Sequence, residues 1–328
     1  MKQIAAALKE YDNYVIVGHE HPDPDSLGSM LGLYFGLKQL GKSCRMVSAD
    51  PIPQNLSWPG LKCIEHIPTD FEPAHDECII VVDCEPARTG SIAPGIQKGK
   101  YLINIDHHRG HRGTGDMVYV DPSEAATSVI VYRILKELGV QIDRNIATAL
   151  YGGIVGDTGG FRYANTTSEV LRIGAALLDC GVEPDTIARE IFASQPLSFM
   201  KLLGFALDNL QQDVDGKLVW VTVSYDDFKR FNADPVQTDH LVQYARMVDT
   251  TEVAVVFREV EPGEIRVGFR ANSVDVEQLA RHFGGGGHRL ASGAKIMGDL
   301  DTVAREVIET ARQYLIKGEL SERNHKRH

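Results

Sequence analysis

Four short segments of the chain place carboxylates or imidazoles directly after an apolar run or a helical pattern. They are residues 18–29, 83, 106–108 and 156–163. Aspartate and histidine without thiolates are ligands that suit hard or borderline divalent ions such as Mn²⁺ and Mg²⁺. Taken singly, such residues are more often helix caps, turn formers or surface groups, but four comparable positions together indicate a metal site. The candidate ligands are His19, Asp23, Asp25, Asp83, His107 and Asp157.

Six ligands are more than one ion can take while it keeps room for substrate and water, so two ions that share a carboxylate fit better. Asp83 is the candidate bridge, because it ends a run of four apolar residues, where an unpaired carboxylate is costly. Two ions about 4 Å apart bind a phosphate and make a bridging water acidic enough to attack it in line. The pattern therefore predicts a two-ion metal site bridged by Asp83, a kind of site that needs no serine or cysteine nucleophile.

The elements that carry these segments alternate between strands and helices in the first half of the chain. Apolar runs predict strands over 14–17, 44–47, 78–82 and 101–105, and helical patterns cover 26–40, 124–138 and 143–155. This alternation is typical of an α/β fold whose parallel sheet is built from βαβ units. Ligands of such sheets bind outside the carboxyl ends of the strands, where three of the four segments lie.

The second half has a different order of predicted helices and strands. Residues 167–212 are helical in pattern; strands are then expected over 218–224, 253–260 and 265–270, and helices over 238–247, 275–282 and 300–315. We expect a smaller α/β domain here, joined to the first domain by a helical connector. The predicted parts are a catalytic domain over 1–185, the connector over 186–212, a substrate-binding domain over 213–318 and a disordered tail over 319–328.

Composition and charge exclude several classes of protein. The 328 residues are 43% hydrophobic and 24% charged, as in an ordinary globular protein, and no apolar stretch approaches the ~18 residues of a membrane span. The net charge is −11, which argues against a protein that coats long nucleic acid. Residues 1–185 hold 16 Lys+Arg and 24 Asp+Glu, so most of the excess acid lies in the predicted catalytic domain. Five widely spaced cysteines predict a reduced, cytoplasmic setting, and the oligomeric state stays open, a homodimer included.

A glycine run in the second half is a candidate substrate site. Residues 284–287 are four glycines whose backbone can approach a ligand and present N–H groups. His288 and Arg289 follow with an aromatic face and a guanidinium suited to a phosphate or a base. The alternative is a flexible turn between a helix and a strand. Arg270 and Asn272 lie at the end of the second hairpin strand, where an arginine is usually a solvated edge charge.

The four acidic and histidine segments together resemble the ordered motifs of the DHH phosphoesterase superfamily. The matching residues are His19-x3-Asp23-x-Asp25, Val82-Asp83, Asp106-His107-His108 and Asp157-Thr158-Gly159. The glycine run with its histidine and arginine resembles the signature of the DHH-associated C-terminal domain, so the resemblance covers nearly the whole chain. In size and motif texture the chain is most similar to the group of small oligoribonucleases (nanoRNases) that also act as 3′-phosphoadenosine 5′-phosphate (pAp) phosphatases.

The resemblance implies a role for each motif residue. One ion, Mn²⁺ or else Mg²⁺, would be held by His19, Asp23 and Asp83, and a second by Asp25, Asp83, His107 and Asp157. Asp106 would orient the ligands, and His108 would face the phosphate as a catalytic group. The substrate would be held by Arg270, Asn272, Gly285, Gly286, Gly287, His288 and Arg289. Gly18 is a departure, because many members carry Asp or Ser before the first histidine.

These roles imply hydrolysis of very short oligonucleotides from an end and release of the 3′-phosphate of pAp. A cyclic-dinucleotide phosphodiesterase of the c-di-AMP type is the main alternative, since the same scaffold supports it. A non-catalytic nucleotide sensor is a second alternative, although a degenerate sensor would be expected to have lost a ligand. Long-strand exonucleases of the superfamily carry further nucleic-acid-binding domains, and a pyrophosphatase would lack the glycine–histidine pattern. The expected partners are short oligonucleotides and mononucleotides, with neither long nucleic acid nor membrane.

Overall fold

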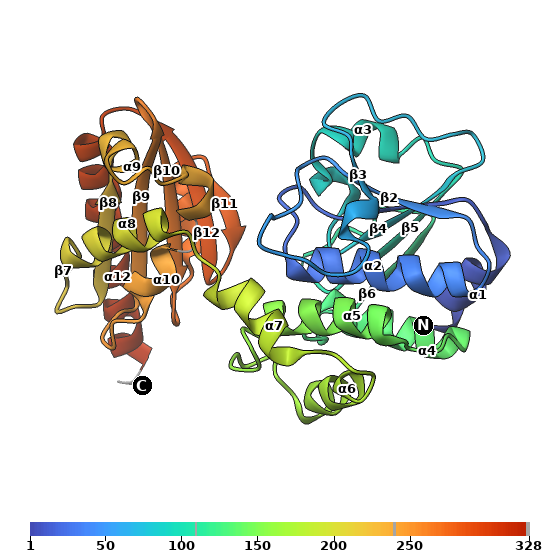
Figure 1. Ribbon diagram of the computed structural model, residues 1–328. Helices are drawn as coiled ribbons and strands as arrows, with labels where there is room; N and C mark the ends of the chain where they lie inside the picture. Colours follow the sequence, from blue (N-terminus) through green and yellow to red (C-terminus); the bar gives the residue numbers. More distant parts are fainter. Residues whose placement is uncertain (109, 239–240, 326–328) are drawn as a thin grey trace. The chain divides into compact units, whose positions relative to one another are not determined.

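The computed structural model describes residues 1–108, 110–238 and 241–325, with the backbone alone described for 236, 237, 288 and 317–325 (Figure 1). The chain forms two compact units, Met1–Ser194 and Gln195–His328. Each unit combines helices with its own six-stranded sheet. The predicted α/β fold, with a parallel sheet in the first half and a smaller second α/β domain, is confirmed.

The first unit is built on a parallel sheet with the strand order β3-β2-β1-β4-β5-β6. Its strands are β1 (Tyr14–Val17), β2 (Cys44–Ser48), β3 (Ile64–His66), β4 (Cys78–Val82), β5 (Tyr101–Asp106) and β6 (Met117–Val120). The central strands β1 and β4 are buried at every residue, which explains their unbroken apolar sequences. The edge strands β3 and β6 were not predicted, because they are short and only partly buried and so carry no apolar run.

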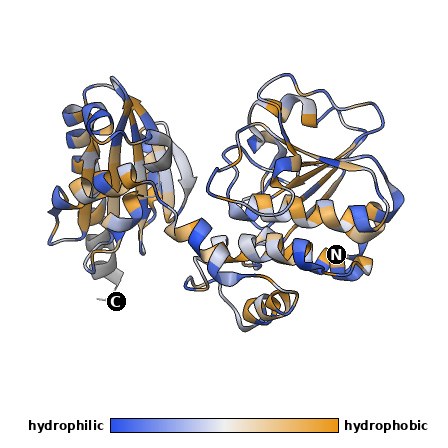
Figure 2. Ribbon diagram, viewed as in Figure 1, coloured by the Kyte–Doolittle hydropathy of each residue, from blue (hydrophilic) through white to orange (hydrophobic). Residues whose placement is uncertain are grey.

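Helices and short turns cover the two faces of this sheet. The helices are α1 (Lys2–Glu10), α2 (Pro24–Gln39), α3 (Ala93–Ile96), α4 (Thr127–Leu138), α5 (Arg144–Asp157), α6 (Ser168–Leu178) and α7 (Pro184–Ala188). Alternate strand residues enter opposite cores: Ile16 and Ile80 pack with α1, α2, α4 and α5, whereas Val15 and Ile79 pack with α3. Figure 2 shows the strands as an apolar layer between these two coverings.

Helices α2 and α5 approach each other closely. A Cβ on Gly28 would lie 2.5 Å from the carbonyl oxygen of Ala149, and a Cβ on Gly156 would lie 2.7 Å from Cβ of Pro24. Glycine is therefore required at both positions, since no side chain fits between the helices. Because α2 begins shortly after β1 and α5 ends at Asp157, this contact places the start of one helix beside the end of the other.

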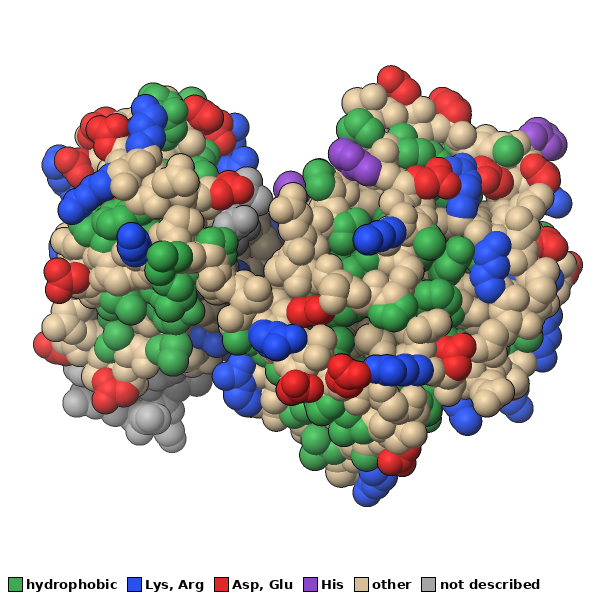
Figure 3. Space-filling view, viewed as in Figure 1, with side chains coloured by type: hydrophobic (Ala, Val, Ile, Leu, Met, Phe, Trp, Pro, Cys, Tyr) green, Lys and Arg blue, Asp and Glu red, His purple; other side chains and the backbone are tan. Residues whose placement is uncertain are grey.

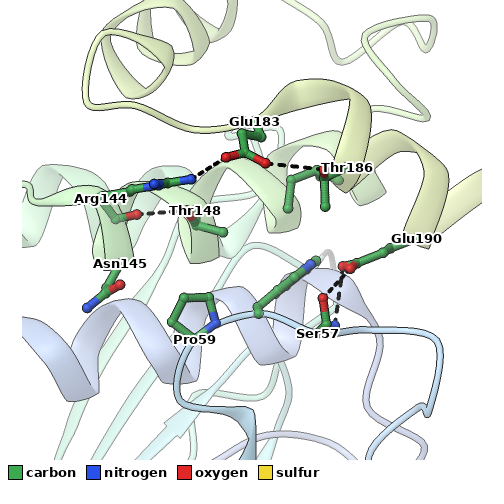
Figure 4. Close-up of a pocket in the computed structure, with 10 residues that line it drawn as sticks. Ser57, Pro59, Arg144, Asn145, Thr148, Glu183, Thr186 and Glu190 are labelled. Carbon is green, nitrogen blue, oxygen red and sulfur yellow. Dashed lines mark hydrogen bonds and ion pairs between the residues drawn. The ribbon is translucent and has the colours of Figure 1, made fainter.

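The end of the first unit is hydrogen-bonded to the loop that follows β2. After α7 the chain makes a π-helical turn, η4 (Arg189–Ala193), in which Glu190 is buried. The carboxylate of Glu190 accepts a hydrogen bond from the backbone N–H of Ser57 at 3.3 Å, and Asn55 donates to the carbonyl oxygen of Glu190 at 2.7 Å. Glu190 and Ser57 lie on one side of a hollow of about 320 Å³ (Figure 4).

The second unit has a mixed sheet with the strand order β11-β12-β10-β9-β8-β7, in which only β8 and β9 are parallel. Its strands are β7 (Gln211–Asp213), β8 (Leu218–Val223), β9 (Val253–Glu261), β10 (Glu264–Ala271), β11 (Gly286–His288) and β12 (Ala291–Met297). Its helices are α8 (Leu197–Asp208), α9 (Tyr225–Phe231), α10 (Leu241–Arg246), α11 (Val276–His282) and α12 (Leu300–His325). One face packs on α11 and α12, and the other on α8, α9 and α10.

The glycine run is partly an edge strand rather than a turn. Its last residues belong to β11, which pairs antiparallel with β12. A Cβ on Gly285 would lie 2.1 Å from the carbonyl oxygen of Gly293. A Cβ on Gly287, whose φ is +144°, would lie 2.6 Å from Cα of Ser292. The glycines are therefore needed for the two backbones to approach each other.

Two helices of the second unit differ from the prediction in their bounds. The helix expected over 238–247 is observed as α10, and residues 239 and 240 lie outside the described part. Helix α12 continues past the expected end at 315, while 326–328 lie outside the described part, so the tail over 319–328 stays a prediction. Among the described residues, no helix combines the length and the apolar character that crossing a bilayer requires.

Candidate metal centre

The six predicted metal ligands lie together at the carboxyl edge of the parallel sheet. Neighbouring strands β1, β4 and β5 carry His19, Asp83 and His107 just beyond their ends, and helices α2 and α5 carry Asp23, Asp25 and Asp157. Their donor atoms form groups in which all atoms lie within 4.8 Å of one another. The groups are His19, Asp23 and Asp83; Asp25, His107 and Asp157; and Asp83, His107 and His108, which links the other two.

In the first group, one histidine ring nitrogen faces two carboxylates. Nε2 of His19 lies 3.5 Å from Oδ1 of Asp23 and 3.6 Å from Oδ2 of Asp83. Nδ1 of His19 lies 2.7 Å from the carbonyl oxygen of Glu20. Since a carbonyl oxygen can only accept, Nδ1 carries a proton, and Nε2 is the nitrogen that faces the carboxylates and could bind an ion. Such an arrangement of acceptors suits a shared cation.

The second group repeats the arrangement around His107. Nε2 of His107 lies 3.0 Å from Oδ2 of Asp157, 3.7 Å from Oδ1 of Asp83 and 4.0 Å from Oδ2 of Asp25. Nδ1 lies 3.2 Å from the carbonyl oxygen of Glu124, which again assigns the proton to Nδ1. The His107 side chain is 13% exposed, and its Nε2 thus faces three carboxylates from a mostly buried position. A ring nitrogen in such surroundings, with its other nitrogen held by a carbonyl oxygen, fits a metal ligand.

The buried carboxylates of Asp25 and Asp83 are held by the first turn of α4. Both oxygens of Asp25 accept backbone hydrogen bonds there, from the N–H of Thr127 at 2.6 Å and from the N–H of Ser128 at 2.9 Å. The hydroxyl of Thr127 donates to Oδ1 of Asp83 at 2.9 Å. Asp83 has a φ of +64°, a left-handed conformation that aspartate tolerates better than most residues. These donors fix both carboxylates before any ligand binds.

The cluster is electrostatically unbalanced without a cation. Burial raises the pKa of Asp83 well above its ordinary value, and the carboxylate of Asp25 raises it further. Burial also raises the pKa of Asp157 to about 6, despite the imidazole of His107. Burial lowers the pKa of His19, but the carboxylates of Asp23 and Asp83 outweigh it and raise the value to about 11. The folded chain therefore favours added positive charge here, which protons or divalent ions supply.

Asp106 and His108 form a pair next to the ligand groups. Burial raises the pKa of Asp106, but hydrogen bonds from the His108 imidazole and from two backbone N–H groups outweigh it and hold the pKa below its ordinary value. Nδ1 of His108 lies 2.8 Å from Oδ1 of Asp106, and the His108 side chain is 28% exposed. The pair thus joins a buried carboxylate to an imidazole that solvent reaches.

Two residues at the site were not predicted from the sequence. Thr127 has no recognisable signal, because 44 positions separate it from Asp83, the residue that it contacts. His111 lies in the loop after β5, and its Nε2 is 3.9 Å from Oδ2 of Asp106. Its closeness to the motif at 106–108 is the signal that could have found it, although nothing in the sequence shows that the loop turns back.

The residues predicted to hold substrate lie in the second unit. Arg270 of β10 is opposite Ala291 of β12, which is opposite His288 of β11, so these positions form one row across the sheet edge. Nη1 of Arg270 donates to the carbonyl oxygen of Phe269 at 2.9 Å. The side chain of His288 lies outside the described part of the structure. Strand β10, which carries Arg270, is thus two strands away from the glycine run.

The other two predicted substrate residues contact the backbone of their own unit. The side-chain amide of Asn272 donates to the carbonyl oxygen of Thr251 at 2.6 Å. Nη2 of Arg289 donates to the carbonyl oxygen of Ser273 at 2.6 Å, and the Arg289 side chain is exposed. The side-chain amide of Asn272 is therefore used in a contact within its own unit. Arg289 uses only one of its guanidinium nitrogens in its contact with Ser273.

Comparison with known protein families gives a match in each unit. The DHH family, N-terminal domain, matches residues 13–154, and the DHHA1 domain matches residues 211–317. A protein from Thermus thermophilus named bifunctional oligoribonuclease and PAP phosphatase NrnA is 34% identical over 320 residues, covering 97% of this chain and 95% of the relative. A protein of the same name from Bacillus subtilis is 28% identical, covering 93% of this chain and 98% of the relative.

Solved structures agree with the observed fold. An exopolyphosphatase-related protein from Bacteroides fragilis is 25% identical, with a TM-score of 0.87 and coverage of 96% of this chain and 95% of that one. RecJ from Thermus thermophilus, solved in complex with Mn²⁺, is 14% identical with a TM-score of 0.53, and the match covers 95% of this chain and 55% of RecJ. The likeness to RecJ shows a shared fold.

Proposed function

The chain belongs to the DHH family, and we propose that it is a two-metal phosphoesterase that hydrolyses very short oligonucleotides from an end and releases the 3′-phosphate of pAp. The family expected from the motifs, including the DHH-associated C-terminal domain, is confirmed. The names of the Thermus and Bacillus relatives, which are similar over nearly all of this chain, support both activities.

The two oxygens of Asp83 carry this proposal. Oδ2 faces Nε2 of His19 at 3.6 Å, and Oδ1 faces Nε2 of His107 at 3.7 Å. One carboxylate thus offers an oxygen to each ligand group, which is the arrangement that two ions sharing a bridge require. Divalent ions bound there would neutralise phosphoryl oxygens and supply an acidic water. We propose Mn²⁺, because the donor set mixes two imidazoles with carboxylates, whereas Mg²⁺ prefers oxygen ligands and retains water.

His108 would contact the phosphoryl group directly. Because its Nδ1 donates to Asp106, Nε2 is the nitrogen that would point at a phosphoryl oxygen. Asp106 holds this ring in one orientation, while the hydroxyl of Thr127 holds the bridging carboxylate of Asp83. These residues orient the reacting groups before the substrate arrives, which lowers the reorganisation that the reaction needs.

We propose that the second unit binds the nucleotide through Arg270, the glycine run and Arg289. Short substrates fit the acidity of the chain better than a polymer does, since a net charge of −11 repels long nucleic acid. On the face drawn in Figure 3, the acidic and basic side chains of the described residues are interspersed rather than sorted into a basic strip. All five cysteines are free thiols, which supports the expected cytoplasmic setting.

A competition panel tests the function. The purified chain with Mn²⁺ is offered pApA, pAp and c-di-AMP, and kcat/KM is measured for each. We expect the highest values for pApA and pAp. A preference for c-di-AMP would replace the proposal by the cyclic-dinucleotide alternative, and tight nucleotide binding without turnover would favour a sensor.

Asp83→Ala tests the mechanism. Removing the proposed bridge should abolish Mn²⁺-stimulated hydrolysis of pApA and weaken Mn²⁺ binding measured by calorimetry. Asp76→Ala, which changes an exposed aspartate elsewhere in the same unit, is the control and should retain both. Retention of Mn²⁺-stimulated hydrolysis by the Asp83 variant would contradict the two-metal mechanism.

A further inference from the structure

A buried histidine beside the metal centre has one ring nitrogen that no described residue engages. The side chain of His111 is 2% exposed. The backbone N–H of Gly113 donates to its Nδ1 at 2.8 Å. A nitrogen that accepts carries no proton, so His111 is neutral and its proton is on Nε2. Among the described residues this Nε2 is buried without a hydrogen-bond partner.

Among the described residues, the carboxylate oxygen near this nitrogen is Oδ2 of Asp106, which lies 3.9 Å from Nε2. The other oxygen, Oδ1, already accepts from the backbone N–H groups of His107 and His108 at 2.7 and 3.1 Å and from Nδ1 of His108 at 2.8 Å. Leaving a buried donor unsatisfied costs about 1–3 kcal/mol. A movement of roughly 0.9 Å would bring Nε2 within hydrogen-bond distance of Oδ2.

We propose that His111 is a positioning residue. When substrate binds, its Nε2–H group donates a hydrogen bond to Oδ2 of Asp106. Asp106 then carries an imidazole on each oxygen, so its carboxylate plane is fixed from both sides. This in turn fixes the ring of His108, the group that would face the phosphoryl oxygens. Hydrogen bonds of catalytic groups often tighten only in the substrate complex, which accounts for the present distance. The role of His108 rests on the proposed function.

Two substitutions at one position separate positioning from packing. His111→Phe keeps a ring of similar volume but removes both nitrogens, whereas His111→Gln keeps an N–H group near the place of Nε2. With pAp and Mn²⁺, we expect kcat to fall 10- to 100-fold in the Phe variant and to recover largely in the Gln variant. KM for pAp and the apparent Mn²⁺ affinity should stay unchanged in both. An unchanged kcat in the Phe variant, or equal losses in both variants, would overturn the inference.

A double-mutant cycle tests whether His111 acts through Asp106. We compare Asp106→Asn, His111→Phe and the double variant. If the two residues form one unit, the double variant should lose no more activity than Asp106→Asn alone, within about twofold. Multiplied losses would show that His111 acts independently and would overturn the inference.

The tautomer of His111 gives a readout that needs no hydrolysis. The imidazole ¹⁵N chemical shifts of the wild-type chain, recorded without metal and with Mg²⁺, should show a neutral ring with the proton on Nε2. A proton on Nδ1, or a doubly protonated ring, would overturn the inference. A chain that shows the expected tautomer but hydrolyses neither pAp nor pApA would contradict the proposed function, and a missing coupling between His111 and Asp106 in an active chain would contradict only the present inference.

Discussion

The two units present their proposed ligand-binding groups in opposite ways. The first unit uses charged side chains at strand ends, and it buries Asp25, Asp83 and Asp106 almost completely. The second unit would use glycine backbone at an exposed sheet edge, with Arg270 of β10 two strands away. Buried carboxylates need donors prepared in advance, because an unpartnered one is costly. An exposed backbone edge needs only the absence of side chains.

This difference predicts which property each unit loses when its residues are substituted. Substitutions at the metal centre should remove charge, coordination and hydrogen bonds at the same time, and so should reduce turnover strongly. Substitutions at the glycine edge should mainly weaken nucleotide binding and leave metal binding intact. The following predictions test this contrast, from the largest expected effect to the smallest.

Asp25→Asn should give the largest loss. The amide cannot accept hydrogen bonds with both of its atoms, so its NH₂ group would face the backbone N–H of Thr127 or Ser128. We expect kcat/KM for pAp to fall about 1000-fold or more, equivalent to roughly 4 kcal/mol of lost transition-state stabilisation. Mn²⁺ titration calorimetry should show weakened binding.

The matched control for this change is Asp143→Asn. Asp143 likewise accepts two backbone N–H groups, from Asn145 and Ile146, as the N-cap of α5. Asparagine caps helices as well as aspartate does, so activity and stability should stay near wild type. Equal losses at both positions would mean that capping, rather than the metal centre, explains the effect at Asp25.

Asp157→Asn should reduce activity about 100-fold but raise the stability of the metal-free chain. Its folded pKa is raised to about 6 from an ordinary value of 3.8, so the charged carboxylate destabilises the metal-free fold. That penalty is complete above pH 6, shrinks as the pH falls, and is absent below about 3.8. In EDTA at pH 7 the variant should therefore melt a few degrees higher than wild type.

Adding Mn²⁺ should reverse this order of stability. The ion binds the folded wild-type chain and stabilises it by mass action, whereas the variant has lost a ligand. Melting curves of both proteins in EDTA and in Mn²⁺, at pH 4 and pH 7, test the reversal. If the variant melts higher under all four conditions, Asp157 is not a ligand.

Arg270→Gln should raise KM for pAp about tenfold, because a charge-assisted hydrogen bond contributes about 1.5–3 kcal/mol. Mn²⁺ affinity should not change. Arg266→Gln is the matched control, since Arg266 is four residues earlier on the same strand and so on the same face. A KM that rises equally in both variants would show that the overall positive charge of the sheet, rather than a contact of Arg270, explains the effect.

Gly287→Ala should give the smallest change in activity. A Cβ would meet Cα of Ser292 at 2.6 Å and the residue would keep a φ of +144°, so we expect a loss of about 1–2 kcal/mol in unfolding free energy and a few-fold higher KM. Gly286→Ala is the control for the change in stability, because no atom lies within 4 Å of its Cβ position. A destabilised Gly286 variant would contradict the pairing of β11 with β12.

The sequence was informative wherever one residue carried its own signal. The strand ends before Asp83 and His107 could be predicted, because apolar runs stop there and charged residues follow. Contacts between distant segments could not: the N–H groups that bind Asp25 come from residues 102 and 103 positions away. The β11 strand was also missed, since glycine has no strand preference and the pairing depends on how close β12 comes.

The hydrogen bonds between Asp25 and the start of α4 make two amide protons informative. Thr127 and Ser128 donate their backbone N–H groups to a carboxylate that would also bind an ion. Loading the centre would restrain that carboxylate, and with it the first turn of the helix. Deuterium uptake at these two amides should therefore slow as ions bind. Hydrogen exchange at the start of α4 would then report the metal occupancy without any attached label.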